Sequence, residues 1–241
     1  MAENESDKVI QAVNATVPAV DLDSVQSEVI DFLPACATVS IDTINTMRTI
    51  TIDFGTEPCL CAEWDTRYRE GKIIATWSGG YRDSSTVITI ITQDYFQGDL
   101  PSQMNKFEYS KTVTNMGHNV NGNLHYAVNV SQTLITLYNN ETITWTSQRD
   151  REWTAGDTTL LIFDDVYSIT GSATGVDRNG DPFTANITTA LIVKLNCPWI
   201  TQGTIEIAAG ANPTVTLYYG DGTCDNDATV SVNGNTFIIQ L

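Results

Sequence analysis

The residues that enzymes use most often for catalysis are scarce in this sequence. Nucleophilic triads need a histidine base, and the 241 residues contain two histidines, His118 and His125. No His-Glu-x-x-His or Gly-x-Ser-x-Gly segment accompanies them. Carboxylates are abundant, but no two of them stand out as the pair of a glycoside hydrolase. We therefore assign no catalytic residue and expect a protein that is not an enzyme.

One segment combines aromatic and basic side chains in a strand-like pattern. Alternation along it places two tryptophans and two arginines on one face: Trp145, Arg149, Arg151 and Trp153. Asp150 and Glu152 then lie on the other face. Such a surface could stack a sugar ring and clamp its hydroxyls or a carboxylate. Alternatively, the Arg and Trp side chains stack on each other and the carboxylates pair across strands. An exposed loop of similar composition is expected at Trp64, Arg67, Tyr68 and Arg69.

Metal ligands are weakly indicated at two places. Asp221, Asp225 and Asp227 form an oxygen-rich loop around Cys224, which predicts either a weak calcium site or a solvated acidic turn. Cys59 and Cys61 are separated by one residue, whereas structural zinc sites prefer two to four residues between paired ligands. Calcium is therefore the one cofactor considered.

The five cysteines indicate disulfides instead. Strand-like residues 200–208 and 214–219 flank a break of small residues, and a hairpin centred near residue 210 or 211 makes Cys197 and Cys224 face each other. Cys36 comes just before the first expected strand, and it is predicted to pair with either Cys59 or Cys61. Such crosslinks indicate an oxidising compartment.

From residue 35 to residue 241 the apolar pattern has period two and is rich in Thr, Val and Ile, which predicts an antiparallel β domain of about twelve strands. Strands are expected at 72–78, 86–92, 107–114, 124–130, 133–138, 142–153, 166–176 and 183–195, with others at both ends. Asn-Gly and Asp-Gly pairs between them favour tight hairpins. The fold class is mainly β: one antiparallel meander forming a curved sheet, barrel or sandwich.

The N-terminal residues have a different composition. Residues 1–8 are polar and are expected to be a disordered tail. Residues 9–34 predict a helical segment that packs on the sheet, because Val25, Val29 and Leu33 recur at four-residue spacing before Pro34. An amphipathic helix for a membrane or partner is the alternative, disfavoured by its few basic residues.

The charge and hydropathy of the chain argue against two kinds of interaction, binding to nucleic acid and crossing a membrane as a helix. The chain carries 29 acidic and 12 basic residues, a net charge of −17, so it repels nucleic acid. No apolar stretch approaches the roughly 18 residues of a transmembrane helix.

Three late parts of the chain carry a family resemblance: Asp164–Tyr167 with Ile169–Gly171, Cys197–Ile200, and Tyr219–Asp225. They resemble segments of an uncharacterised family of exported proteins and lipoproteins of Bacteroidota. This resemblance implies export without implying an activity. Residues 3–7 look like the acidic stretch that follows the lipidated cysteine of such lipoproteins, which implies a lipid anchor in the precursor.

Together these observations predict an exported protein at the outer-membrane surface, in the periplasm or outside the cell. We expect a structural, adhesion or binding role toward a glycan, an apolar ligand or a protein. One alternative is a carrier that holds a lipid or other apolar ligand in a β cavity. A second alternative is a glycoside hydrolase.

Overall fold

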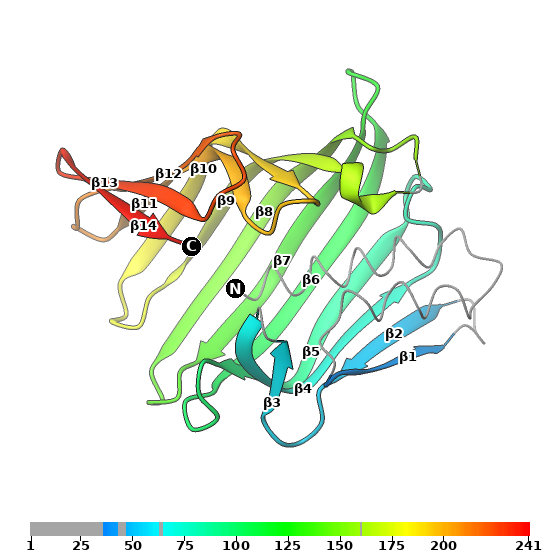
Figure 1. Ribbon diagram of the computed structural model, residues 1–241, viewed down its shortest axis with the longest axis horizontal. Helices are drawn as coiled ribbons and strands as arrows, with labels where there is room; N and C mark the ends of the chain where they lie inside the picture. The colour runs from blue at the N-terminus through cyan, green and yellow to red at the C-terminus, as the bar shows by residue number, and fades with distance from the viewer. Residues whose placement is uncertain (1–35, 43–46, 63–64, 160) are drawn as a thin grey trace. The chain divides into compact units, whose positions relative to one another are not determined.

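A computed structural model describes residues 36–42, 47–62, 65–159 and 161–241, and these residues form antiparallel strands joined by short turns (Figure 1). The predicted tail at 1–8 and helical segment at 9–34 lie outside the described residues. The strands are β1 Thr38–Asp42, β2 Arg48–Asp53, β3 Cys59–Ala62, β4 Asp65–Trp77, β5 Val87–Gly98, β6 Asn105–His118, β7 Leu124–Thr136, β8 Thr142–Ala155, β9 Val166–Val176, β10 Pro182–Lys194, β11 Ile200–Ala209, β12 Val215–Asp221, β13 Asp227–Val232 and β14 Asn235–Gln240. A single 3₁₀ turn, η1, covers Ile162–Asp164 within this part of the chain.

The mainly β, antiparallel fold class is confirmed. The hydrogen-bonded order is β1-β2-β4-β5-β6-β7-β8-β9-β10-β11-β12-β13-β14, with β3 paired to β4 beside this path. Except for β2 and β3, consecutive strands are neighbours, because the turns between them are too short for a crossover. No helix among the described residues is both long enough and apolar enough to cross a membrane.

The Asn-Gly signals are placed correctly, and the turns around them differ in size. Asn233 and Gly234 have φ values of 50° and 77°, and they link β13 to β14 as a two-residue turn, with Val232 facing Asn235. The other two Asn-Gly pairs, Asn121-Gly122 and Asn179-Gly180, lie at the tips of wider turns. These turns are closed by backbone hydrogen bonds from Asn119 N to Asn123 O and from Asp177 N to Asp181 O. Several strand bounds also differ from expectation: β4 and β5 extend well beyond the predicted 72–78 and 86–92, and residues 124–136 form one strand where two were expected. Strand β3 was not anticipated.

The described chain divides into two compact units. Unit 1 contains the residues up to Thr114 together with Val130–Thr144, and unit 2 contains Asn115–Asn129 and Trp145–Leu241. Strands β6, β7 and β8 therefore each contribute residues to both units.

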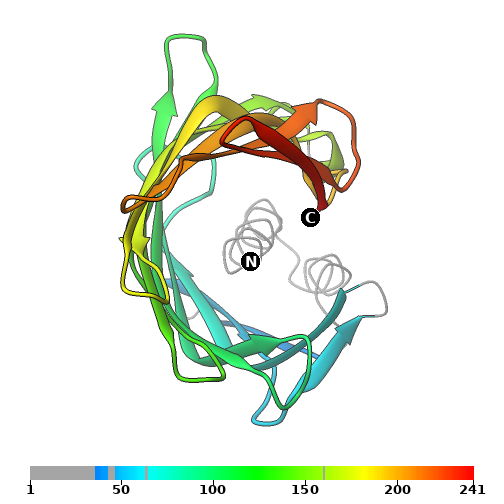
Figure 2. The ribbon, with the colours of Figure 1, turned by 90° about the vertical axis from the view of Figure 1, so that its left-hand side faces the viewer.

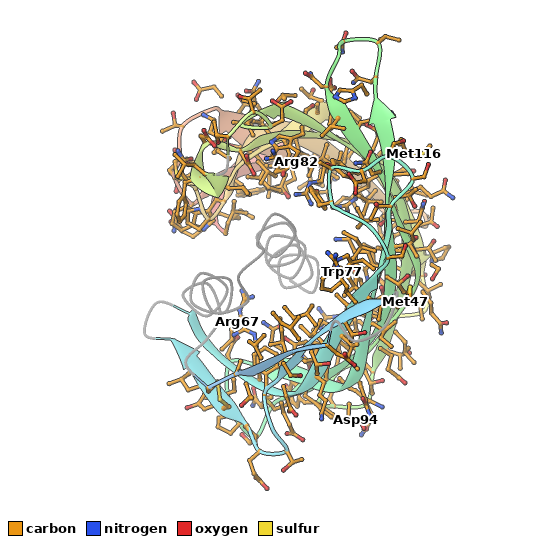
Figure 3. The ribbon with its side chains drawn as sticks, turned by 90° about the vertical axis from the view of Figure 1, so that its right-hand side faces the viewer. Met47, Arg67, Trp77, Arg82, Asp94 and Met116 are labelled. Carbon is orange, nitrogen blue, oxygen red and sulfur yellow. A yellow bond between two sulfur atoms is a disulfide. The ribbon has the colours of Figure 1, made fainter. Side chains whose placement is uncertain are left out.

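In unit 1 the strands lie in one layer (Figure 2), and the side chains on one face of this layer are buried. Ile50, Ala75 and Ile90 are fully buried on neighbouring strands, and Trp77 directly faces Ile88. The opposite face carries an ion pair, in which Lys72 Nζ lies 2.8 Å from the Asp53 carboxylate. Trp77 and Asp94 lie on opposite faces of this layer (Figure 3).

A β-bulge in β5 changes which residues reach the buried face of unit 1. Ile88 and Ile90 are buried before the bulge, and Tyr95 and Gln97 are buried after it. The register with β6 shifts between Ile91 and Tyr95, which shows one extra residue in β5. Asp94 within the bulge has a φ of 44°.

In unit 2, strands β9 to β14 continue the meander, each paired with the next. The core includes Trp153 and Tyr167, which are at most 1% exposed. β14, drawn in red at the end of this series, pairs with β13 alone within the described part of the chain (Figure 1).

Each unit contains one disulfide. Cys197 and Cys224 are joined in unit 2, with their Cα atoms 5.8 Å apart. Cys36 pairs with Cys59, at 6.1 Å, which decides between the two partners considered for it. Two disulfides are consistent with an oxidising environment.

The Cys197–Cys224 bridge does not form between facing residues, although the hairpin register predicted a facing pair. Ile207 faces Val215, so the hairpin is centred at residue 211 as expected. A bulge between Thr204 and Gln202 then shifts the register, and the cysteines lie beyond the last ladder pair, Gln202 and Asp221. They meet as neighbours outside the ladder and not as a facing pair.

Replacing Cys197 and Cys224 together by serine should lower the free energy of unfolding by about 2–4 kcal/mol, because the crosslink closes a loop across 27 residues of the unfolded chain. Urea unfolding followed by tryptophan fluorescence measures this change. Oxidised and fully reduced wild-type protein serve as the two references. A double variant as stable as the oxidised protein would contradict this account.

Candidate functional site

The predicted aromatic and basic face of β8 lies mostly inside unit 2. Trp153 is completely buried and Arg151 is 6% exposed, whereas Trp145 and Arg149 are half-buried. The Arg151 guanidinium lies 3.9 Å from the centre of the Tyr167 ring, and the Trp153 and Tyr167 ring centroids are 5.5 Å apart. These contacts are typical of internal stacking, the alternative considered for this segment.

A buried carboxylate completes this cluster. Trp153 Nε1 donates to Asp165 Oδ1 at 3.2 Å, and the Tyr167 hydroxyl donates to Oδ2 of the same residue at 3.4 Å. Asp165 is 2% exposed. The cluster therefore fixes the inner face of β8 and β9, and its two largest side chains are not available to stack a sugar.

The two carboxylates of β8 pair across strands on the other face. Asp150 Oδ2 lies 2.8 Å from His125 Nδ1 on β7. Glu152 Oε1 accepts from Asn119 Nδ2 and Asn123 Nδ2, each at 2.8 Å. The hydrogen bonds from these two side-chain amides lower the pKa of Glu152, and the bond from Asn119 has the larger effect. The arrangement ties the Asn119–Asn123 turn to β8.

The three aspartates of the predicted calcium loop are each engaged in local hydrogen bonds. Asp221 accepts from the Thr223 hydroxyl, Asp225 from the Asp227 backbone N–H, and Asp227 from the Gln240 amide. Among the residues that the structure describes, no three His, Cys, Asp or Glu side chains gather where they could hold a metal ion.

The more unusual constellation lies on the buried face of unit 1, where polar groups share one end of the sheet. Arg69 on β4 is 0% exposed and directly faces Gln97 on β5, which is 1% exposed. Gln97 in turn faces Asn105 on β6. Facing residues of antiparallel strands share a face, so these three side chains form one row across three strands, here called the polar row.

An aromatic row follows the polar row two residues further along the strands. Tyr95 faces Phe107, with ring centroids 6.1 Å apart, and Phe54 lies 5.7 Å from Tyr95. The Arg69 guanidinium is 6.0 Å from the centre of the Phe54 ring. Beyond the aromatic rings the face is aliphatic, with Ile52, Ile73 and Ile90 all at most 3% exposed.

Some of the buried polar atoms on this face have no hydrogen-bond partner within the described part of the chain. They include both amide atoms of Gln97 and the Nε1 of Trp77. Burying such a group unpaired costs about 1–3 kcal/mol, and protein interiors rarely contain one. A face that keeps a buried amide unpaired beside a buried guanidinium is better suited to meeting a polar group than to sealing a core.

The sequence reasoning missed this site. It placed Arg69 in an exposed loop, whereas the residue is buried within β4. Arg69 is separated by even numbers of residues from the buried Ile73, Ala75 and Trp77, so all four have the same parity and lie on one face of the strand. That parity was the available signal. No comparable signal existed for Gln97, because the β5 bulge reverses the parity set by Ile88 and Ile90. Comparison with family models, curated proteins and solved structures finds nothing that matches this chain.

The bulge depends on Gly71, whose φ is +83° and whose added Cβ would lie 1.8 Å from the Asp94 carbonyl oxygen. We expect Gly71→Ala to lower the free energy of unfolding by more than about 3 kcal/mol, since it combines a clash with positive-φ strain. Gly55→Ala is the matched control, because Gly55 has the same φ and open space around it. Equal losses in chemical unfolding of the two variants would refute a role for close approach.

Glu152→Gln should reduce stability above about pH 5, because a carboxylate whose pKa is lowered by folding stabilises the folded state only when ionised. The difference from wild type should shrink as pH falls through the lowered pKa. The side chain is largely solvated, so the effect should stay below about 1 kcal/mol. Glu206→Gln, at an exposed position on β11, removes the same charge as a control. Urea unfolding from pH 3 to 7 measures both, and parallel pH profiles would contradict the assignment.

Proposed function

We propose that this protein is an exported, non-catalytic β-protein that binds an amphiphilic molecule with an anionic head group on the buried face of unit 1. The observation that carries the proposal is the unpaired Gln97 amide, 1% exposed and directly opposite the fully buried Arg69. The proposal combines two expectations from the sequence: a binding role, and a carrier of a lipid or other apolar ligand.

The polar row has the chemistry to receive the head group. The positive charge of the buried Arg69 guanidinium attracts an anionic group to this end of the face. The Gln97 Nε2 donates to a further ligand oxygen, and its Oε1 accepts from a ligand hydroxyl or protonated acid. Burial strengthens these bonds because little water competes for the charge.

The rest of the face has the chemistry to receive an apolar tail. Along β5, the buried side chains from Tyr95 to Ile88 span on the order of 20 Å at the usual strand rise. These residues are aromatic next to the polar row and aliphatic farther away. An extended acyl chain beside an anionic head group matches this order of surfaces, whereas a compact polar ligand such as a sugar does not.

Export is supported by the disulfides Cys36–Cys59 and Cys197–Cys224, since such bonds persist in oxidising compartments. The resemblance to exported proteins and lipoproteins of Bacteroidota points the same way. A location at the outer-membrane surface, in the periplasm or outside the cell would give the protein access to lipids released from membranes.

The test is titration of the full-length protein with oleate and with lysophosphatidic acid, followed by native mass spectrometry and calorimetry. Monoolein, which has a similar tail and no charge, is the control ligand. We expect both anionic probes to bind and Gln97→Leu to weaken them about tenfold, as loss of a hydrogen bond to a charged group predicts. Whichever acid binds more tightly identifies the head group.

Gln93→Leu is the matched control variant, because Gln93 lies on the same strand and is exposed. It should leave binding unchanged. Without ligand, Gln97→Leu should unfold at the wild-type temperature or above it, since it removes an unpaired buried amide. Failure of every anionic probe to bind, or equal binding by wild type and Gln97→Leu, would overturn the proposal.

A further inference from the structure

The edge strand β14 is unusually exposed for so apolar a segment. All six residues of Asn235–Gln240 are exposed, with Phe237 at 55%, Ile238 at 71% and Ile239 at 39%. Phe237 and Ile239 lie on one face of the strand and Ile238 on the other, so apolar side chains meet solvent on both faces.

Within the described part of the chain, β14 also has peptide groups on its outer edge that no other strand pairs with. Leu241 N donates to Asn226 O, and the register runs without a shift from Asp227↔Gln240 to Val232↔Asn235. Hydrogen-bonded and non-bonded pairs alternate in an antiparallel ladder. Therefore Thr236, Ile238 and Gln240 direct their peptide N–H and C=O groups away from β13.

The usual protection of an edge strand is missing from this segment. Natural sheets block their edges with Lys, Pro, inward-pointing charges or bulges. β14 contains no charged residue and no Pro, although the whole chain carries a net charge of −17. Its pairing with β13 contains no bulge.

We propose that β14 pairs with β14 of a second copy of this chain, forming a symmetric antiparallel dimer through a continuous ladder. The pattern of outward peptide groups favours this occupant. When Ile238 faces its own copy, Thr236 faces Gln240 of the second protomer, so all three outward-directed residues meet outward-directed residues.

The side chains fit the same register. Phe237 then faces Ile239 of the other protomer on one face, twice by symmetry, and aromatic residues pair well with β-branched ones across strands. On the other face Ile238 meets Ile238. The contact is isologous, so it closes at two copies instead of growing into a filament.

The dimer is expected to be weak and to depend on salt in an unusual direction. One six-residue strand buries less area than a standard stable interface, so association in the micromolar range is expected. Two protomers of charge −17 repel each other, and salt screens that repulsion while leaving the uncharged ladder intact. Raising the ionic strength should therefore strengthen the dimer.

Sedimentation velocity of the full-length protein from about 1 to 300 μM, at low and at moderate salt, tests the proposal. We expect a monomer–dimer equilibrium that salt strengthens, and a loss of affinity of at least tenfold in Ile238→Lys, which places a charge on the edge. Val176→Lys is the matched control, since Val176 is an exposed apolar strand residue on β9. It should dimerise as wild type does.

Crosslinking tests the register independently. In a Cys61→Ser background, Ile238→Cys should form an intermolecular disulfide under mild oxidation, because facing residues bring their Cα atoms within the separation found in disulfides. Val176→Cys should not. A protein that stays monomeric throughout, a dimer indifferent to Ile238→Lys, or a ladder of larger species would each overturn the proposal.

Discussion

The β-bulge of β5 is the constraint on which the candidate site depends. A strand with regular pleating keeps odd and even residues on opposite faces, so a strand that buries Ile88 and Ile90 would expose Tyr95 and Gln97. The extra residue before Tyr95 reverses that parity and brings both side chains to the buried face. Gly71 permits the bulge because it has no Cβ to meet the Asp94 carbonyl oxygen.

Much of the fold could be predicted because its signals are local. Val166–Val176 has the bounds expected from alternation, and Asn233-Gly234 forms the expected tight turn. Errors arose where nonlocal pairing decides the outcome. Residues 131–132 did not interrupt β7, since a strand paired on both sides tolerates a polar break, and β3 was too short to show a period.

The candidate site was less predictable for the same physical reason. Alternation correctly placed Arg151 and Trp153 on one face of β8, but it could not tell whether that face was free or filled by Tyr167 and Asp165 from β9. Arg69 is charged, and charged residues are seldom fully buried, so composition alone argued for exposure. The sequence did not identify Gln97 as a site residue, because its position opposite Arg69 depends on the bulge.

Unit 1 buries polar side chains, whereas the last strand of unit 2 exposes apolar ones. Unit 1 buries an arginine and a glutamine among aromatic rings, where each polar atom has a large effect because little water screens it. β14 exposes Phe237 and Ile238 and contains no charged residue, although the chain has 29 acidic residues. Neither arrangement favours an isolated, sealed fold, because an unpaired buried amide and an unprotected edge both lower stability or solubility. Both become favourable when a second molecule supplies the missing contacts: a polar head group at Gln97, and a strand at β14.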